Sequence, residues 1–538
     1  MIGNREATFT IAGVLLAAAV TAWLALLYGV SWHLAGGTSD NAAAVLAGRD
    51  MVHGNVLLHG WHLAADSFWL LDLPLLGFAA HWGLGPAVFH LVPTAVATAT
   101  VLVAMRHAAW RMSRREAAVA AFATFLIIGL PSPLFASFFL QGPTHVVTVL
   151  CCLLGFGLLV PGAEFPRLAV GCFILLIAVA ADPLALVIGV LPVVVAGVAV
   201  SRMADFRAGL SLVAAGVVAG VGGEGLVRAV AALGGFRRLP PLGFAARSRW
   251  VPNLHLAAHD FLYTFGVRVL PSWPYVAWPV RLVHVAGIAL AGAAVTLAAI
   301  DLTRRIVLGR GRGTWIDDVC VLGFVGSVSF FVGVVFPGEN VSRTRYLLPA
   351  MVFAAILAGR FASRVVGDVF DGVGARRAGL RAERGMRTVA VAVALVLLAG
   401  YGAETVASTR TTNPPNPAIA LAAWLSAEHL TDGWGGYWDA TVTTVASDEH
   451  VRVRPVIAVG GRLHAFGDLA SDTWFSARSG RLPARFLVYQ PRSPWGDVNL
   501  ATATTTFGNP AERARVGSFE VLIWDRDTRA HLEPLVVR

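Results

Sequence analysis

Long apolar runs separated by short polar connections fill the first three quarters of this chain. A helix needs about 20 apolar residues to cross the hydrocarbon core of a bilayer. By this rule the pattern predicts about 11 transmembrane helices. The predicted helices are centred near Ala18, Thr94, Phe125, Cys152, Leu175, Val190, Val217, Ile288, Gly326, Ala354 and Leu395.

The pattern changes after the helix-breaking run from Thr411 to Pro417. An amphipathic helix that begins near Ile419 comes first, and β-branched runs with alternating polarity follow it. The runs predicted as strands are Ala440 to Val445, Val451 to Val459, Arg485 to Tyr489 and Phe519 to Trp524. We therefore predict a membrane domain over residues 1–402 and a small α/β domain over residues 403–538.

Composition agrees with this division and excludes a soluble protein. The chain is 56% hydrophobic and 14% charged, and its mean hydropathy is +0.68. The fold class predicted is an all-α polytopic membrane protein with a small C-terminal α/β domain. The formal net charge is +10, and every basic residue is Arg. We assign this charge to membrane topology and expect no nucleic-acid partner.

The arginines of the short loops predict the orientation. Positive charge marks the cytoplasmic side of a membrane protein, and the arginine-rich loops share one side if the N-terminus is inside. The C-terminal domain then lies outside the cytoplasmic membrane. The arginines that set this expectation are Arg106, Arg111, Arg114, Arg115, Arg202, Arg207, Arg304, Arg305, Arg310, Arg312 and those from Arg360 to Arg387.

The first external loop, residues 31–84, is much longer than most connections between helices. Asn41 to Met51 reads as a helix, and the segment from Trp61 to Leu76 is too polar to span, so both are predicted to lie along the membrane surface. Asp40 is the candidate general base, because a fixed carboxylate can take the proton of an attacking hydroxyl. The alternative is that Asp40 is only the N-cap of the following helix.

Other polar residues of the external loops are weaker candidates. Asp66 and Asp72 suit a second acid or a metal ligand, although solvated carboxylates are the commoner explanation. The turn that ends at His145 and the turn at Asp182 either line the same cavity or only end helices. The histidines of the first loop lack metal-ligand spacing, and the cysteines lack a CxxC motif. We expect no metal site and no cofactor.

Several external arginines run against the orientation rule, and phosphate binding is one explanation, because a guanidinium offers paired donors to phosphate oxygens. The alternative is contact with lipid head groups. The arginines are Arg237, Arg238, Arg247 and Arg249.

A second polar group lies at the external end of a predicted helix and consists of Glu339, Arg343, Arg345 and Tyr346. Arg345 and Tyr346 are placed to reach a lipid phosphate. The alternative is an interfacial Glu–Arg pair with Tyr346 in the aromatic belt. In the terminal domain, Trp434, Tyr437 and Trp438 are predicted as core, with stacking on a sugar ring as the alternative.

This arrangement resembles the GT-C superfamily of membrane glycosyltransferases, which includes protein O-mannosyltransferases and aminoarabinose transferases. The resemblance rests on Asp40 soon after the first helix, on interfacial helices, on Arg345-Tyr346 with Pro349, and on the external C-terminal domain. Many members carry paired acidic residues in the first loop, whereas this chain has Asp40-Asn41. The resemblance covers residues 8–402 in layout more than in identity.

The resemblance implies an inverting transfer of a sugar from a polyprenyl-phosphate donor to a glycan, lipid or protein acceptor outside the membrane. Asp40 would be the base and Arg345 a phosphate contact, and membrane lipids would surround the protein. Two other functions remain open at this point. One is transport of a lipid-linked glycan, and the other is a non-catalytic scaffold.

Overall fold

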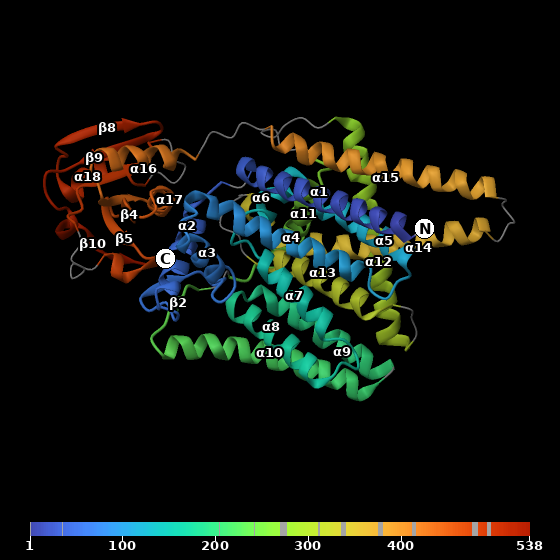
Figure 1. Ribbon diagram of the computed structural model, residues 1–538. Coiled ribbons are helices and arrows are strands. Elements are labelled where there is room, and N and C mark those ends of the chain that lie inside the picture. The colour runs from blue at the N-terminus through green and yellow to red at the C-terminus, as the bar shows by residue number, and fades with distance from the viewer. Residues whose placement is uncertain are drawn as a thin grey trace.

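The computed structural model describes residues 2–34, 36–203, 205–240, 243–268, 277–309, 313–334, 341–374, 380–410, 416–475, 482–491 and 497–537. A bundle of long helices forms the larger part, and a domain built on a mixed sheet covers one end of the bundle (Figure 1). The N-terminus lies toward the other end (Figure 1). The predicted fold class, a polytopic helical membrane protein with a small C-terminal α/β domain, is confirmed.

Eight helices in the described part of the chain are long and apolar enough to cross a membrane, or nine if a bent pair counts as one span. The eight spans fall in α1 (Ile2–Leu34), α4 (Val88–Ala108), α9 (Leu191–Met203) with the π-helical turn before it, α10 (Phe206–Ala232), α12 (Trp278–Leu308), α13 (Trp315–Gly333), α14 (Leu348–Gly374) and α15 (Leu380–Ser408).

The remaining predicted centres fall in apolar helices that are bent or short. α5 (Arg114–Thr124) and α6 (Pro133–Phe139) meet at 86°, and the bend lies where Pro131 and Pro133 interrupt helical hydrogen bonding. α7 (Val146–Leu158) and α8 (Phe165–Ala181) have fewer residues than a full span. The count of eleven therefore stays a prediction.

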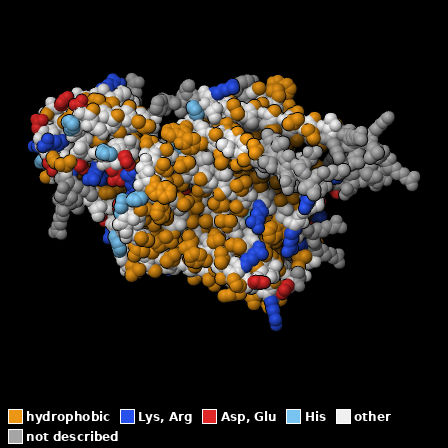
Figure 2. All heavy atoms as spheres, viewed as in Figure 1, with side chains coloured by type: hydrophobic (Ala, Val, Ile, Leu, Met, Phe, Trp, Pro, Cys, Tyr) orange, Lys and Arg blue, Asp and Glu red, His pale blue; other side chains and the backbone are white. Residues whose placement is uncertain are grey.

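The surface of the bundle shows the expected division of side chains. Hydrophobic side chains cover the middle of the visible face (Figure 2). Arginine side chains gather at the end of that face away from the C-terminal domain (Figure 2). This separation is what a lipid-facing belt with one positively charged rim requires.

The C-terminal domain holds a seven-stranded sheet of order β10-β5-β4-β3-β7-β9-β8, in which β3 is parallel to both of its neighbours. Its strands are β3 (Asp432–Gly436), β4 (Arg452–Val459), β5 (Arg462–Phe466), β7 (Phe486–Tyr489), β8 (Glu512–Val516), β9 (Phe519–Ile523) and β10 (Glu533–Val536), and its helices are α16 (Pro417–Ala427), α17 (Tyr437–Ala446) and α18 (Leu500–Phe507). Three of the four predicted strands are β4, β7 and β9.

The fourth predicted strand, Ala440 to Val445, is wrong, because these residues form most of α17. Threonine hydroxyls in this helix donate hydrogen bonds to carbonyls of the preceding turn. Thr443 Oγ1 donates to the Asp439 carbonyl at 2.6 Å, and Thr444 Oγ1 donates to the Ala440 carbonyl at 3.3 Å. The helix packs on β4 and on the long loop that follows the first membrane helix. In the sequence, the alternation of threonine with apolar residues is typical of a strand, so the pattern alone did not indicate this helix.

The predicted boundary at residue 402 lies within α15, which continues to Ser408. α16 then begins the C-terminal domain, called the outer domain from here on, at Pro417 with Asn416 as its N-cap. The Asn416 side chain also donates to the Gly37 carbonyl at 3.1 Å. This bond attaches the start of the outer domain to the short segment that follows α1.

A small three-stranded sheet joins segments from three parts of the chain. β1 (Trp61–Leu63) of the first loop lies between β2 (Arg237–Arg238), which follows α10, and β6 (Ala470–Ser471) of the outer domain. β1 is parallel to β2 and antiparallel to β6. Main-chain bonds therefore hold the first loop, the bundle and the outer domain in one fixed arrangement.

The two helices of the first loop, α2 (Ser39–Val52) and α3 (Asp72–His81), cross with their backbones in contact. A Cβ on Gly48 would lie 2.1 Å from the Leu73 carbonyl oxygen, and one on Gly77 would lie 2.2 Å from the Gly48 carbonyl oxygen. Only glycine fits at this crossing, and small residues allow such a close approach. The crossing sets the direction of α2 and thereby the position of Asp40.

Candidate active site

A cavity of about 60 Å³ lies where the first loop, the bundle and the outer domain meet. Asp40, Asp66 and Arg345 line it, together with an apolar wall. The apolar part of the wall includes Ala43, Ala44, Trp61, Leu63, Phe68, Leu73, Pro143 and Leu469. Two carboxylates and one guanidinium therefore face a shared, largely apolar space.

Asp40 is in the first turn of α2 but is not its N-cap. Thr38 holds that position, and its hydroxyl accepts a bond from the Asn41 backbone N–H at 3.3 Å. The capping alternative for Asp40 is therefore wrong. Tyr437 of α17 donates its hydroxyl to Asp40 Oδ1, while Oδ2 has no hydrogen-bond partner in the part of the chain that the structure describes.

Burial raises the pKa of Asp40 above its ordinary value. The hydrogen bond from Tyr437 and the charge of Arg345 act in the opposite direction, and the charge of Asp66 adds to the rise. A carboxylate with a raised pKa is a better proton acceptor, so this environment suits a general base. The same environment raises the pKa of Tyr437, so its hydroxyl stays protonated and continues to donate.

Arg345 is held at the cavity by the 3₁₀ turn from Val341 to Leu347, which leads directly into α14. Its guanidinium donates to the Tyr346 hydroxyl at 3.2 Å and lies 5.1 Å from the centre of the Tyr346 ring. Tyr346 is buried against His145, with 4.9 Å between ring centroids. The aromatic-belt alternative for Tyr346 is therefore wrong, because the ring packs inside the protein.

His145 connects two of the turns that the sequence singled out. Its Nδ1 lies 2.7 Å from Asp182 Oδ2, which also accepts from Thr148 Oγ1 at 2.7 Å. Because an ionised carboxylate can only accept, Nδ1 carries a proton and Nε2 points the other way. Nε2 lies 3.8 Å from Asp66 Oδ2. His145 thus links the buried Asp182 to a carboxylate in the cavity wall.

Asp72 and Arg238 lie behind this wall. Burial and the nearby charge of Asp182 raise the pKa of Asp72 to about 7, and the charge of His145 opposes the rise. Arg238 donates to the Ala180 carbonyl at 2.9 Å and its charge interacts with Asp66 and Asp182. Arg238 pairs with Leu63 in the β1–β2 ladder, and this pairing places Arg238 next to the cavity wall.

The structure does not bring the other predicted residues to the cavity. Arg237, Arg247 and Arg249 are exposed and do not line it. Arg343 lies 3.3 Å from Asp260 Oδ2 on α11 (Arg247–Thr264), so it ties the 3₁₀ turn to that helix. Glu339 lies outside the described residues. A role in substrate binding for these residues stays a prediction.

Sequence reasoning did not place Tyr437 in the site, because the aromatic run of the outer domain read as core. Trp434 does belong to that core, where its indole N–H donates to Thr528 Oγ1 at 2.8 Å. Tyr437, three residues later, begins α17 and points at Asp40. α17 also bonds to the backbone of the first loop, because Thr441 Oγ1 donates to the Ser39 carbonyl at 2.9 Å.

Replacing Tyr437 by phenylalanine is expected to move the acidic limb of the pH–rate profile to higher pH. The hydroxyl stabilises ionised Asp40, so its loss raises the pKa of Asp40 further and the base is protonated at a higher pH. The maximal rate at high pH should change by less than about tenfold, because loss of the hydrogen bond leaves the carboxylate less well positioned while the higher pKa makes it a better base. Rate measurements between pH 4 and 9 test this.

Tyr489→Phe is the matched control, because Tyr489 donates to Glu520 in the same sheet and does not line the cavity. It should leave the acidic limb in place. An unchanged limb in Tyr437→Phe would contradict the assigned role of the hydroxyl.

Long apolar helices, a long loop with two helices after the first of them, and a domain over that loop form the layout that the resemblance predicted. No protein-family model matches the sequence, and no curated protein sequence matches it. Among solved structures, ArnT from Cupriavidus metallidurans in the apo state matches with a TM-score of 0.53 and 13% identity over 96% of this chain and 98% of that chain. ArnT from the same organism bound to undecaprenyl phosphate matches with a TM-score of 0.55 and 12% identity over 95% of this chain and 98% of that chain. The likeness confirms the fold that the resemblance predicted.

Proposed function

We propose that this chain is a glycosyltransferase that moves a sugar from a polyprenyl-phosphate donor to an acceptor outside the cytoplasmic membrane. The observation that supports this most directly is the shared cavity of Asp40 and Arg345. A base and a phosphate contact must stand on the two sides of the reacting sugar carbon, and these two residues belong to different elements that meet there. The likeness to ArnT bound to undecaprenyl phosphate supports a lipid phosphate as the donor group.

In the proposed reaction, the acceptor hydroxyl attacks the anomeric carbon of the donor sugar from the side opposite the phosphate. The new carbon–oxygen bond forms as the bond to the phosphate oxygen breaks, so the configuration inverts. The hydroxyl proton passes to Asp40, and the leaving oxygen takes the bonding electron pair. Arg345 stabilises the negative charge that grows on the leaving phosphate.

Asp66 lines the cavity, and His145 lies behind it, with its Nε2 3.8 Å from Asp66 Oδ2. We assign Asp66 to sugar binding, because a carboxylate can accept hydrogen bonds from sugar hydroxyls. His145, which Asp182 holds through its Nδ1, supports the assignment because it lies next to Asp66. The reaction needs no metal in this account. Among the described residues, no three His, Cys, Asp or Glu side chains form a metal-binding group.

The cavity volume of about 60 Å³ is smaller than the roughly 300 Å³ at which most small-molecule sites begin. The donor sugar therefore requires the wall to open. The contact between Tyr437 and Asp40 joins the outer domain to the first loop across the cavity. We propose that this hydrogen bond breaks when the donor enters and forms again around it, while the main-chain bonds of the three-stranded sheet keep the two parts together.

A transfer assay in proteoliposomes tests the proposal. The purified chain is supplied with a panel of undecaprenyl-phosphate sugars and with lipid, glycan and peptide acceptors, and release of undecaprenyl phosphate is followed. We expect release that depends on both donor and acceptor and is lost in Asp40→Asn. Movement of intact donor across the bilayer without cleavage would overturn the proposal in favour of transport.

A further inference from the structure

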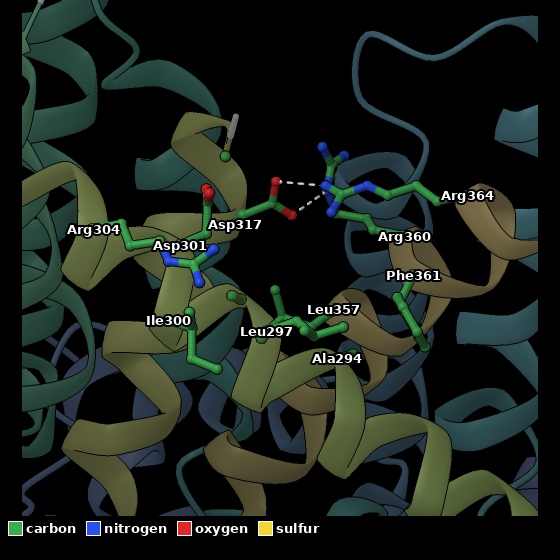
Figure 3. Close-up of a pocket in the computed structure, with 12 residues that line it drawn as sticks. Ala294, Leu297, Ile300, Asp301, Arg304, Asp317, Leu357, Arg360, Phe361 and Arg364 are labelled. Carbon is green, nitrogen blue, oxygen red and sulfur yellow. Dashed lines mark hydrogen bonds and ion pairs between the residues drawn. The ribbon is translucent and has the colours of Figure 1, made fainter. Parts of the chain in front are cut away.

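A second pocket lies among α12, α13 and α14, toward the ends of these helices that carry Arg304, Asp317 and Arg364 (Figure 3). Its volume is about 230 Å³. None of its lining residues belongs to the lining of the Asp40 cavity. It is a separate feature of the bundle, and nothing in the proposed transfer uses it.

One end of the pocket is charged and fixed in place. Asp317 accepts from Arg360 Nε at 2.7 Å and from Arg364 at 2.9 Å (Figure 3). Arg360 also donates to Thr314 Oγ1 at 2.9 Å, and to three carbonyls at the end of α4, those of His107, Ala108 and Trp110. These bonds join α4, α13 and α14, so the charged end is a preformed structure.

The charged side chains that line the pocket have a net charge of +1. Arg304, Arg360 and Arg364 supply three positive charges, and Asp301 and Asp317 supply two negative ones. Asp317 is neutralised by its two arginines. Arg304 is exposed and, among the residues that the structure describes, forms no ion pair, while the Arg364 side chain is 53% exposed. An anion at this end would meet two accessible guanidinium groups.

The other end of the pocket is apolar. Ala294 and Leu297 of α12 lie below the charged residues, opposite Leu357 and Phe361 of α14 (Figure 3). Ala298 also lines the pocket. From Ala294 to Arg304 the helix rises about 15 Å, at about 1.5 Å per residue. Leu297 is 49% exposed and Ile300 is 41% exposed, as residues facing lipid would be.

We propose that this pocket binds one anionic phospholipid. Its phosphodiester lies between Arg304 and Arg364, and one acyl chain follows the apolar face of α12 from Leu297 toward Ala294. The single surplus positive charge matches the single negative charge of a phosphodiester. An apolar channel that continues from the charged end distinguishes a lipid from a soluble phosphate, which would use only the charged end. The orientation predicted from the arginines places the site in the cytoplasmic leaflet, where anionic lipids are bound by basic residues.

Native mass spectrometry of the full chain, released from micelles with added phosphatidylglycerol or phosphatidylethanolamine, tests the site. We expect one phosphatidylglycerol to be retained in preference to phosphatidylethanolamine. Arg304→Gln should weaken that binding about fivefold, the usual worth of one arginine near an anionic lipid surface. Arg207→Gln, an exposed arginine at the start of α10 and outside the pocket, is the matched control and should bind as the unaltered chain does.

A second pair of variants separates the lipid from a free phosphate. Ala298→Phe fills the apolar end, whereas Ala293→Phe adds the same ring to an exposed position outside the pocket. Only Ala298→Phe should abolish retention of the lipid, and soluble glycerol phosphate should not bind to any of the proteins. Equal loss in Arg304→Gln and Arg207→Gln, or unchanged binding in Ala298→Phe, would overturn the proposal. Because none of these measurements follows sugar transfer, the result does not depend on the proposed enzyme function.

Discussion

Asp40→Asn is expected to slow sugar transfer by about 100- to 10,000-fold, the usual contribution of a general base. An amide of the same shape can still accept from Tyr437, so the fold should remain, but it cannot take the proton of the acceptor hydroxyl. In the unaltered chain, the rate should fall with decreasing pH at a value above the ordinary aspartate pKa of 3.8, because burial raises the pKa of Asp40. The variant should lose this acidic limb.

Asp50→Asn is the matched control for this prediction. Asp50 lies in the same helix, and its carboxylate accepts from the Trp61 indole N–H at 2.8 Å; an amide oxygen can accept the same bond. It should transfer at nearly the rate of the unaltered chain. An Asp40→Asn protein that is inserted, folded and fully active would show that another group takes the proton.

Arg345→Gln is expected to lower the maximal rate by about 100- to 1,000-fold, the cost of removing one donor that stabilises charge in a transition state. Arg345 faces the cavity, and its Nε is buried without a hydrogen-bond partner among the described residues. Loss of its charge also removes an interaction that lowers the pKa of Asp40, so the acidic limb should move to higher pH. Steady-state rates at several pH values measure both effects.

The arginines of α11 provide the comparison. If the donor phosphate binds at Arg345, the double variant Arg247→Gln and Arg249→Gln should keep most of its activity, because both side chains are exposed outside the cavity. A larger loss in the double variant than in Arg345→Gln would place the phosphate at α11. The two outcomes distinguish the alternatives that the sequence left open for the external arginines.

Much of the fold could be predicted, because the length of an apolar run and the spacing of apolar residues within it are local properties of the sequence. The predicted helix from Asn41 to Met51 corresponds to α2, and every predicted span centre falls in a helix. The segment from Ala440 to Val445 could not be assigned in this way. Its conformation depends on packing against β4 and on a bond to Ser39, a residue about 400 positions earlier.

The site could be predicted only in part, for a similar reason. Asp40, Asp66, His145 and Arg345 carried signals of their own, since each is a polar residue at an external helix end or loop. Tyr437 carried none, because a tyrosine beside two tryptophans in a small domain reads as core. Its role depends on the three-stranded sheet that brings the outer domain against the first loop. That sheet has only two or three residues in each strand, too few for a sequence pattern.

A structure of the Asp40→Asn protein in lipid nanodiscs with an intact undecaprenyl-phosphate sugar would test the central claim most directly. The variant should bind the donor without cleaving it. We predict that the donor phosphate contacts the Arg345 guanidinium and that the anomeric carbon faces residue 40 across the widened cavity. A donor phosphate bound at Arg247 and Arg249, with the cavity between Asp40 and Arg345 still closed, would contradict it.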